Sequence, residues 1–149
     1  MCYYTSEMAC PYFYPVERHA GELGPAGAIL PLGDAWSGVC RAAGPPRQPP
    51  EEQLRPLCYF GYARGRCGLF PKEDAGPDAD RFAIASDDGA AIGIHYVQER
   101  DHHPFAHGSL QYSRSSRRIL QQPLGETVAR QAEAYVESYL RRKSEASQR

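Results

Sequence analysis

The sequence lacks three features that assign a protein to a broad class at once. It has no apolar run near the ~20 residues of a membrane-spanning helix, so we expect no membrane insertion. It has no excess of one charge, with 17 basic and 18 acidic residues, so we expect no strong attraction to nucleic acid. Residues 1–20 have no basic start followed by an apolar segment, which predicts no export and a cytoplasmic location.

Familiar catalytic motifs are missing as well. The sequence contains no phosphate-binding glycine loop, no G-x-S-x-G nucleophile elbow and no H-E-x-x-H zinc helix. A protein without catalytic activity is therefore favoured, and no catalytic residue is assigned from a motif.

The length of 149 residues predicts one domain spanning residues 1–149. Residues 72–80, KEDAGPDAD, are typical of a loop. This loop separates a cysteine-rich half, residues 1–71, from a cysteine-free half whose ordered part covers residues 81–142. We expect an α+β fold in which the first half surrounds a metal centre.

The second half has the pattern of an antiparallel sheet. Alternating apolar and polar residues predict strands at 81–85 and 92–98, joined by a hairpin turn at the Asp-Asp-Gly sequence 87–89. A third strand is predicted around 110–112, after a turn at His107–Gly108.

A C-terminal helix is predicted from about residue 125 to residue 142. Its apolar stripe follows helical spacing and consists of Val128, Ala132, Tyr135, Val136, Tyr139 and Leu140. Basic residues at 141–143 complement the negative end of the helix dipole. A sheet of about three strands needs one face covered, and we expect this helix to cover it.

Little regular structure is expected in the first half, which is rich in glycine and proline. One helical turn is predicted at 34–40, with Asp34 as its N-cap. Residues 43–52, AGPPRQPPEE, predict a connector at the surface.

All five cysteines lie within the first 67 residues. Cytosolic thiols stay reduced, so this clustering favours a metal centre over disulfides. We predict a tetracysteine site formed by Cys10, Cys40, Cys58 and Cys67. Cys2 is left as an alternative ligand to one of these four, because a residue near a terminus is the hardest to hold in place.

The spacing favours an iron–sulfur cluster over zinc. Structural zinc sites usually contain a C-x₂₋₄-C pair, whereas the shortest gap here is seven residues. A [4Fe–4S] cluster accepts cysteines from separate loops, and a Cys-Pro step like Cys10–Pro11 ends the bacterial ferredoxin run. The cluster would serve structure or electron transfer. Zinc is the alternative metal, and thiols packed as small apolar groups without metal are a third interpretation.

Residues 57–67, LCYFGYARGRC, resemble the first half of a CCCH zinc finger. They share its eight-residue gap between cysteines, its aromatic residues and its Gly-x-Cys ending. The resemblance covers eleven residues, since no cysteine follows Cys67 and the next histidine is His95. It implies zinc and single-stranded RNA as a ligand, so a zinc-stabilised adaptor for RNA or a protein partner is an alternative function.

A histidine-rich segment offers a third function. His102, His103 and His107 stand close to Asp101 and could bind a metal or act as a general base in an enzyme. A histidine from this segment could also complete a Cys₃His site. The opposing interpretation is an exposed turn with solvated histidines.

Two groups of arginines are clusters of positive charge in the sequence. Arg114, Arg117 and Arg118 are expected in a solvated loop. Arg64 and Arg66, beside the proposed ligand Cys67, would offset the negative charge of thiolates or face a partner.

Overall fold

The structure is a computed structural model. It describes residues 9–18, 32–33, 36–42, 45–49, 52, 57–59, 61–71, 73, 75–120 and 125–147. Strands β1 (Phe13–Arg18) and β2 (Trp36–Cys40) form a two-stranded antiparallel sheet. A second antiparallel sheet has the order β3 (Ala79–Asp87), β4 (Ala91–Arg100), β5 (His103–Ser113) and β6 (Arg118–Ile119). With helix α2 (Glu126–Ser147), these elements confirm the mixed α+β class.

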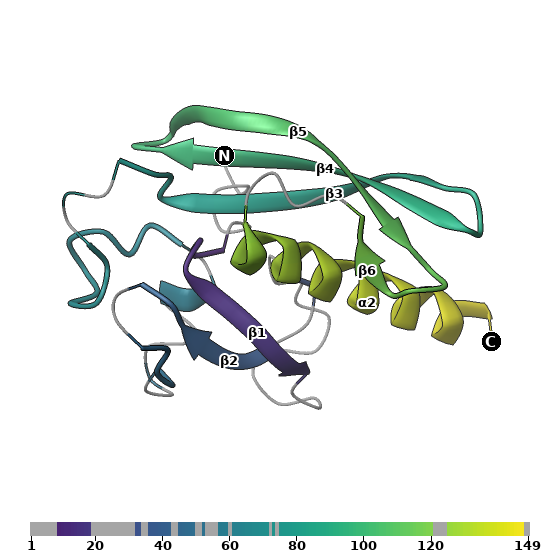
Figure 1. Ribbon diagram of the computed structural model, residues 1–149, viewed down its shortest axis with the longest axis horizontal. Helices are drawn as coiled ribbons and strands as arrows, with labels where there is room; N and C mark the ends of the chain where they lie inside the picture. The colour runs from purple at the N-terminus through teal and green to yellow at the C-terminus, as the bar shows by residue number, and fades with distance from the viewer. Residues whose placement is uncertain are drawn as a thin grey trace.

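Helix α2 lies between the two sheets (Figure 1). It contacts β1 on one side and β3 and β6 on the other. No helix among the described residues is both long and apolar enough to cross a membrane.

Most of the C-terminal prediction is confirmed. Strands β3 and β4 contain the predicted segments, and Phe82 pairs with Tyr96 between them. In the predicted turn, Asp87 Oδ1 accepts the Gly89 N–H at 3.0 Å, and Gly89 has a φ of 91°. The predicted helix is present and continues to Ser147.

The third strand begins earlier than predicted. The chain turns at Asp101–His102, both with positive φ, and β5 starts at His103, so the predicted turn at His107–Gly108 is wrong. Residues 103–105 are exposed, so they show no apolar alternation that would mark a strand. The short strand β6 was not predicted.

The N-terminal half is more regular than expected. Trp36–Cys40 is a strand, so the predicted helical turn is wrong for these residues; 34 and 35 lie outside the described residues. Pairing with β1, which places Phe13 opposite Cys40, overrides the local helical preference. Within the proline-rich connector, residues 45–48 and 52 are exposed, as predicted, whereas Pro49 is buried; 43–44 and 50–51 lie outside the described residues.

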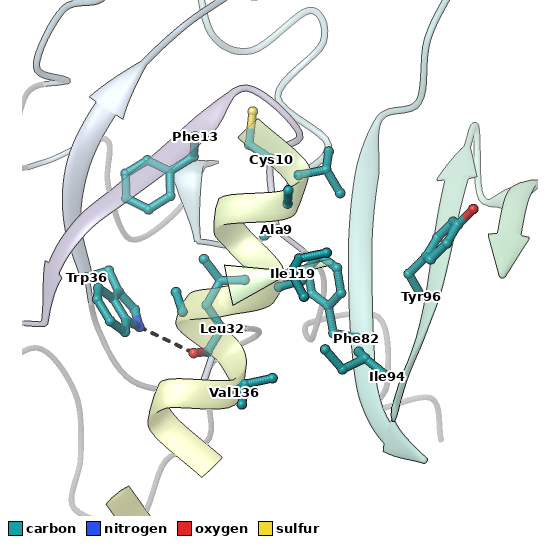
Figure 2. Packing of buried hydrophobic residues seen from close by; sticks show 14 of the residues in the cluster. Ala9, Cys10, Phe13, Leu32, Trp36, Phe82, Ile94, Tyr96, Ile119 and Val136 are labelled. Atoms are coloured by element: carbon teal, nitrogen blue, oxygen red, sulfur yellow. Dashed lines mark hydrogen bonds between the residues drawn. The ribbon is translucent and has the colours of Figure 1, made fainter. Parts of the chain in front are cut away.

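Buried apolar side chains from both halves form one cluster. Figure 2 shows Leu32 and Trp36 on one side of α2, with Phe82 and Ile94 on the other. Val136 of α2 is fully buried between them. The helix is therefore the middle layer of a shared core.

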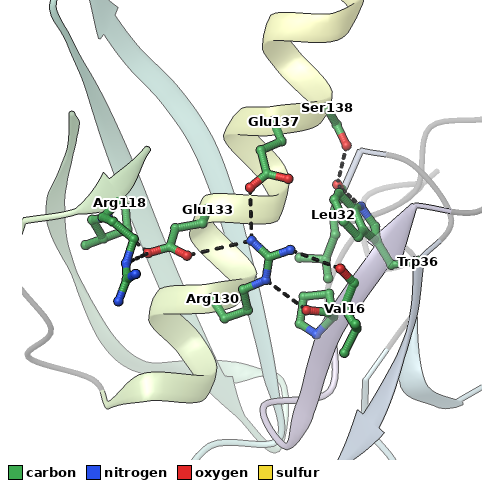
Figure 3. Close-up of polar contacts among 10 residues, drawn as sticks. Val16, Leu32, Trp36, Arg118, Arg130, Glu133, Glu137 and Ser138 are labelled. Carbon is green, nitrogen blue, oxygen red and sulfur yellow. Dashed lines mark hydrogen bonds and ion pairs between the residues drawn. The ribbon is translucent and has the colours of Figure 1, made fainter. Parts of the chain in front are cut away.

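Polar bonds fix the helix against the N-terminal sheet. Arg130 Nε donates to Pro15 O at 2.9 Å, and its Nη1 pairs with Glu137 at 2.9 Å (Figure 3). Ser138 Oγ donates to Leu32 O at 3.2 Å. Pro15 O and Leu32 O are backbone carbonyls of the N-terminal half. The two bonds to them therefore set the positions of β1 and of Leu32 relative to α2.

Strand β2 requires glycine at position 38. A Cβ there would lie 2.1 Å from Tyr14 O and 3.0 Å from Phe13 Cζ. We expect Gly38→Ala to lower the free energy of unfolding by ~2 kcal/mol or more, because backbone must move. Urea denaturation measures this. Gly68→Ala is the control, since a Cβ there meets nothing within 4 Å. Equal stability of the two variants would contradict the β1–β2 packing.

Asp80 is a buried acid whose Oδ1 accepts a hydrogen bond from Gln98 Nε2 at 2.8 Å. Its Oδ2 has no partner among the described residues. Burial raises the pKa of Asp80 from 3.8 to about 7, so the folded protein holds this proton more tightly than the unfolded chain. The stabilisation is complete below about pH 4 and is lost as the pH rises through 7.

We therefore expect Asp80→Asn to remove a pH-dependent loss of stability of about 1.4 kcal/mol per pH unit between these values. The measurement is the free energy of unfolding from pH 4 to pH 8. Asp87→Asn is the control, since Lys143 lowers the pKa of Asp87 from 3.8 to about 2, its contribution is lost only below that upper value, and the slope between pH 4 and pH 8 should not change. An unchanged slope in Asp80→Asn would show that another group causes the dependence.

Candidate metal centre

Three segments of the chain bring Cys10, Cys40, Cys58 and Cys67 to the wall of one cavity. All four thiols are free. The rest of the wall consists of Tyr12, Phe13, Ala42, Leu57, Ala63 and Phe70. The four residues chosen from the sequence thus lie around one space, and Cys2 lies outside the described residues.

Cys10 lies between the two sheets. Its neighbour Ala9 exchanges backbone hydrogen bonds with Asp80 of β3, at 2.6 and 2.8 Å. Cys10 N donates to Cys58 O at 3.1 Å, which joins two of the cysteine segments directly. Cys10 O accepts from Phe13 N at 3.1 Å, so the chain turns there into β1.

Cys40 ends strand β2. It exchanges two backbone hydrogen bonds with Arg47, at 2.7 and 3.1 Å, and these close the intervening loop. The next residue, Arg41, donates its N–H to Tyr12 O at 2.9 Å. These bonds hold the end of β2 beside the Cys10 turn.

Cys58 and Cys67 belong to one compact loop. Gly61 N donates to Leu57 O at 2.9 Å and Cys67 N donates to Ala63 O at 2.7 Å, so Cys58 lies within one turn and Cys67 ends the next. Gly61 has a φ of 73°, and a Cβ there would lie 2.7 Å from the Ala79 side chain. Glycine at this position lets the loop pack directly against β3.

Aromatic rings build the apolar wall. Tyr12 and Phe70 meet edge to face with centroids 5.2 Å apart, and Arg64 covers the Phe70 ring at 4.7 Å. Cys10 is buried, and the other three cysteines are partly exposed. The wall excludes water from one side of the thiols and leaves another side reachable from solvent.

The thiols influence one another electrostatically. Burial raises the pKa of Cys10 and Cys40, and it raises the pKa of Cys58 to about 12, where nearby Cys40 and Cys67 add to the effect. Backbone N–H groups of Tyr12 and Ala42 act in the opposite direction on the pKa of Cys10 and Cys40. The cavity thus disfavours uncompensated thiolates, and a bound cation would supply the missing charge.

The thiols do not have the arrangement of a single-ion site. In the part of the chain that the structure describes, no three His, Cys, Asp or Glu side chains are grouped so that they could hold a metal ion. The donor set therefore fits one metal ion poorly in this arrangement. Thiolates remain the ligands that zinc and iron–sulfur clusters share.

The histidine segment lies apart from this cavity. His102, His103 and His107 are exposed, and none of them lines the cavity. His103 and His107 belong to strand β5, and the His102 ring stacks on Tyr62. The structure thus does not bring the predicted histidine ligand to the cysteines.

The segment that resembles a CCCH finger uses its aromatic residues internally. Tyr59 is buried and donates its hydroxyl to Trp36 O at 2.7 Å. One face of Tyr62 is covered by His102, and Phe60 lies outside the described residues. Cys58 and Cys67 share their cavity with Cys10 and Cys40, which precede them, rather than with later ligands.

Two positioning residues were not found from the sequence. Gln131 of α2 donates to Cys10 O and to Phe13 O, both at 2.7 Å. In the sequence, Gln131 is marked only as a polar residue within the apolar stripe, three positions after Val128 and four before Tyr135. Tyr62, between two of the cysteines, gave no signal apart from its place in that loop.

Comparisons of the chain with models of protein families, with curated proteins and with solved structures found no match. The function is therefore inferred from the chemistry of the cavity.

Proposed function

We propose that the protein binds a metal centre through Cys10, Cys40, Cys58 and Cys67. The observation that carries this proposal is the meeting of four cysteines, from four places in the chain, around one apolar cavity. Small apolar packing alone does not require that four thiols share one wall. Burial raises the pKa of Cys10, Cys40 and Cys58, so thiolates at these three positions would need a compensating cation.

A [4Fe–4S] cluster for structure or electron transfer is the centre we favour. One zinc ion holds four sulfurs roughly 3.5–4 Å apart, because its tetrahedral bonds are near 2.3 Å. A cluster holds them roughly 6–7 Å apart, because it fills the space between them. No three His, Cys, Asp or Glu side chains among the described residues are grouped to hold one metal ion, so either centre would require the sulfurs to take the spacing that its own bonds set. The apolar wall and the backbone N–H groups of Tyr12 and Ala42 suit cluster sulfur ligands.

A zinc-stabilised adaptor is the second candidate. The compact loop from Cys58 to Cys67, with a turn at each cysteine, favours it. Zinc would require the four sulfurs to move together. The partner would then be a protein rather than RNA, because Tyr59 is buried and Tyr62 is covered by His102.

The first test is an absorption spectrum and elemental analysis of protein purified without oxygen. We expect a brown protein with a broad band near ~400 nm, about four irons per chain and bleaching by dithionite. A colourless protein with about one zinc per chain would replace the cluster by the zinc adaptor. Protein without metal, even after reconstitution, would overturn the proposal.

Substitution of single cysteines tests the ligand set. We expect Cys40→Ser to reduce bound metal at least ~10-fold, because a hydroxyl is a poor ligand for a soft metal. Cys2→Ser is the matched control and should keep its metal. Loss of metal in Cys2→Ser and retention in Cys40→Ser would show that the assigned set is wrong.

Metal uptake should release protons. Burial raises the pKa of Cys10, Cys40 and Cys58, so these thiols are protonated at pH 7 before a metal binds. Titration of metal-free protein with Zn²⁺ as a probe, in weak buffer with a pH indicator, should release about three protons or more per ion. Release of less than about one proton would place the ion on groups that are already ionised, such as surface carboxylates.

A further inference from the structure

Tyr62 connects the loop that contains Cys58 and Cys67 to the turn between β4 and β5 in the larger sheet. It lies between Cys58 and Cys67, and its hydroxyl donates to Glu99 Oε1 at 2.6 Å. The same hydroxyl accepts the His102 backbone N–H at 2.9 Å. The Tyr62 and His102 rings are stacked, with centroids 4.1 Å apart and planes 6° from parallel. One side chain thus makes three contacts with the β4–β5 hairpin.

Asp78 provides a second connection between the same two segments. Its Oδ1 pairs with Arg64 Nε at 2.7 Å, and its Oδ2 accepts the Asp101 N–H at 2.8 Å. Its backbone O accepts the Tyr62 N–H at 3.0 Å. The side chain of Asp78 is almost buried, which shields these bonds from solvent. The loop and the hairpin tip therefore share a network rather than one contact.

The backbone of this network is strained. Tyr62, Asp101 and His102 have φ values of 57°, 53° and 62°, in the left-handed region that favours glycine. Such residues persist where surrounding contacts hold them, and they concentrate at functional sites. Here His102 contacts Tyr62 directly, and the N–H groups of Asp101 and Tyr62 both donate to Asp78.

We propose that Tyr62 and the Asp101–His102 tip form a clamp that positions Cys58 and Cys67 for the metal centre. The inference rests on the proposed function, because it assigns the clamp to the same site. The bond from Gly61 N to Leu57 O places Cys58 within a turn before Tyr62, and the bond from Cys67 N to Ala63 O places Cys67 at the end of a turn after it. Holding Tyr62 therefore holds both cysteines before a metal arrives, which lowers the entropy lost on binding.

Tyr62→Phe removes both hydroxyl hydrogen bonds and retains the ring stack. In Zn²⁺-loaded protein we expect zinc to pass to a colorimetric chelator roughly 5- to 30-fold faster than in the wild type, for the loss of two bonds. His107→Ala is the control, since His107 is an exposed histidine of the same hairpin and pairs with Val97, away from the Asp101–His102 turn. Glu99→Gln keeps an acceptor for the hydroxyl and should retain most of the wild-type rate, whereas Glu99→Ala should not.

A second measurement needs no metal. Alkylation of metal-free protein, followed residue by residue by mass spectrometry, should be faster at Cys58 and Cys67 in Tyr62→Phe by a similar factor and unchanged at Cys10. Equal acceleration at all three cysteines would show global destabilisation and overturn the clamp. Rates in Tyr62→Phe that match His107→Ala would overturn it as well. If the wild type binds no metal, the proposed function fails, and the alkylation pattern still decides whether the clamp orders the loop.

Discussion

The buried amide of Gln131 is the contact on which the joining of the two halves depends. Its Nε2 donates to the carbonyls of Cys10 and Phe13, both at 2.7 Å, and the side chain is fully buried. An apolar side chain at this position would take this donor away from both carbonyls and leave Cys10 O with the Phe13 N–H alone, at the cost of lost buried hydrogen bonds. The helix is thereby bonded, and not only packed, to the segment that enters β1.

The same constraint reaches the cysteine cavity. Cys10 is held by Gln131 on one side, and its neighbour Ala9 is held by Asp80 of β3 on the other. One cavity residue is thus fixed by both the helix and the larger sheet. The cysteine loop contacts that sheet again through the Tyr62–Glu99 hydrogen bond, and Arg64 pairs with Asp78 just before β3, so the segments that line the cavity are bonded to the helix and to the larger sheet.

The sequence pattern predicts those helices and strands that have one buried face and one exposed face. Strands β3 and β4 and helix α2 each carry an apolar stripe, and each was predicted. Residues 103–105 at the start of β5 are all exposed, so they lack the alternation of apolar and polar residues that marks a strand. Strand β2 lacks it because Gly38 is required where β1 comes close. The shared cavity of the four cysteines was expected from their clustering, whereas metal binding stays a prediction. The Tyr62–His102 contact joins residues 40 positions apart and depends on left-handed backbone, which no local pattern reveals.

The separation of Gln131 from Cys10 along the chain affects the order of events during synthesis. The two residues are 121 positions apart, and chains leave the ribosome from the N-terminus. All four cysteines of the cavity emerge before the helix that holds Cys10 has been made. The nascent chain therefore presents these thiols to the surrounding solution first, and Cys10 gains its hydrogen bond from the helix only when residues 126–147 have been translated and packed.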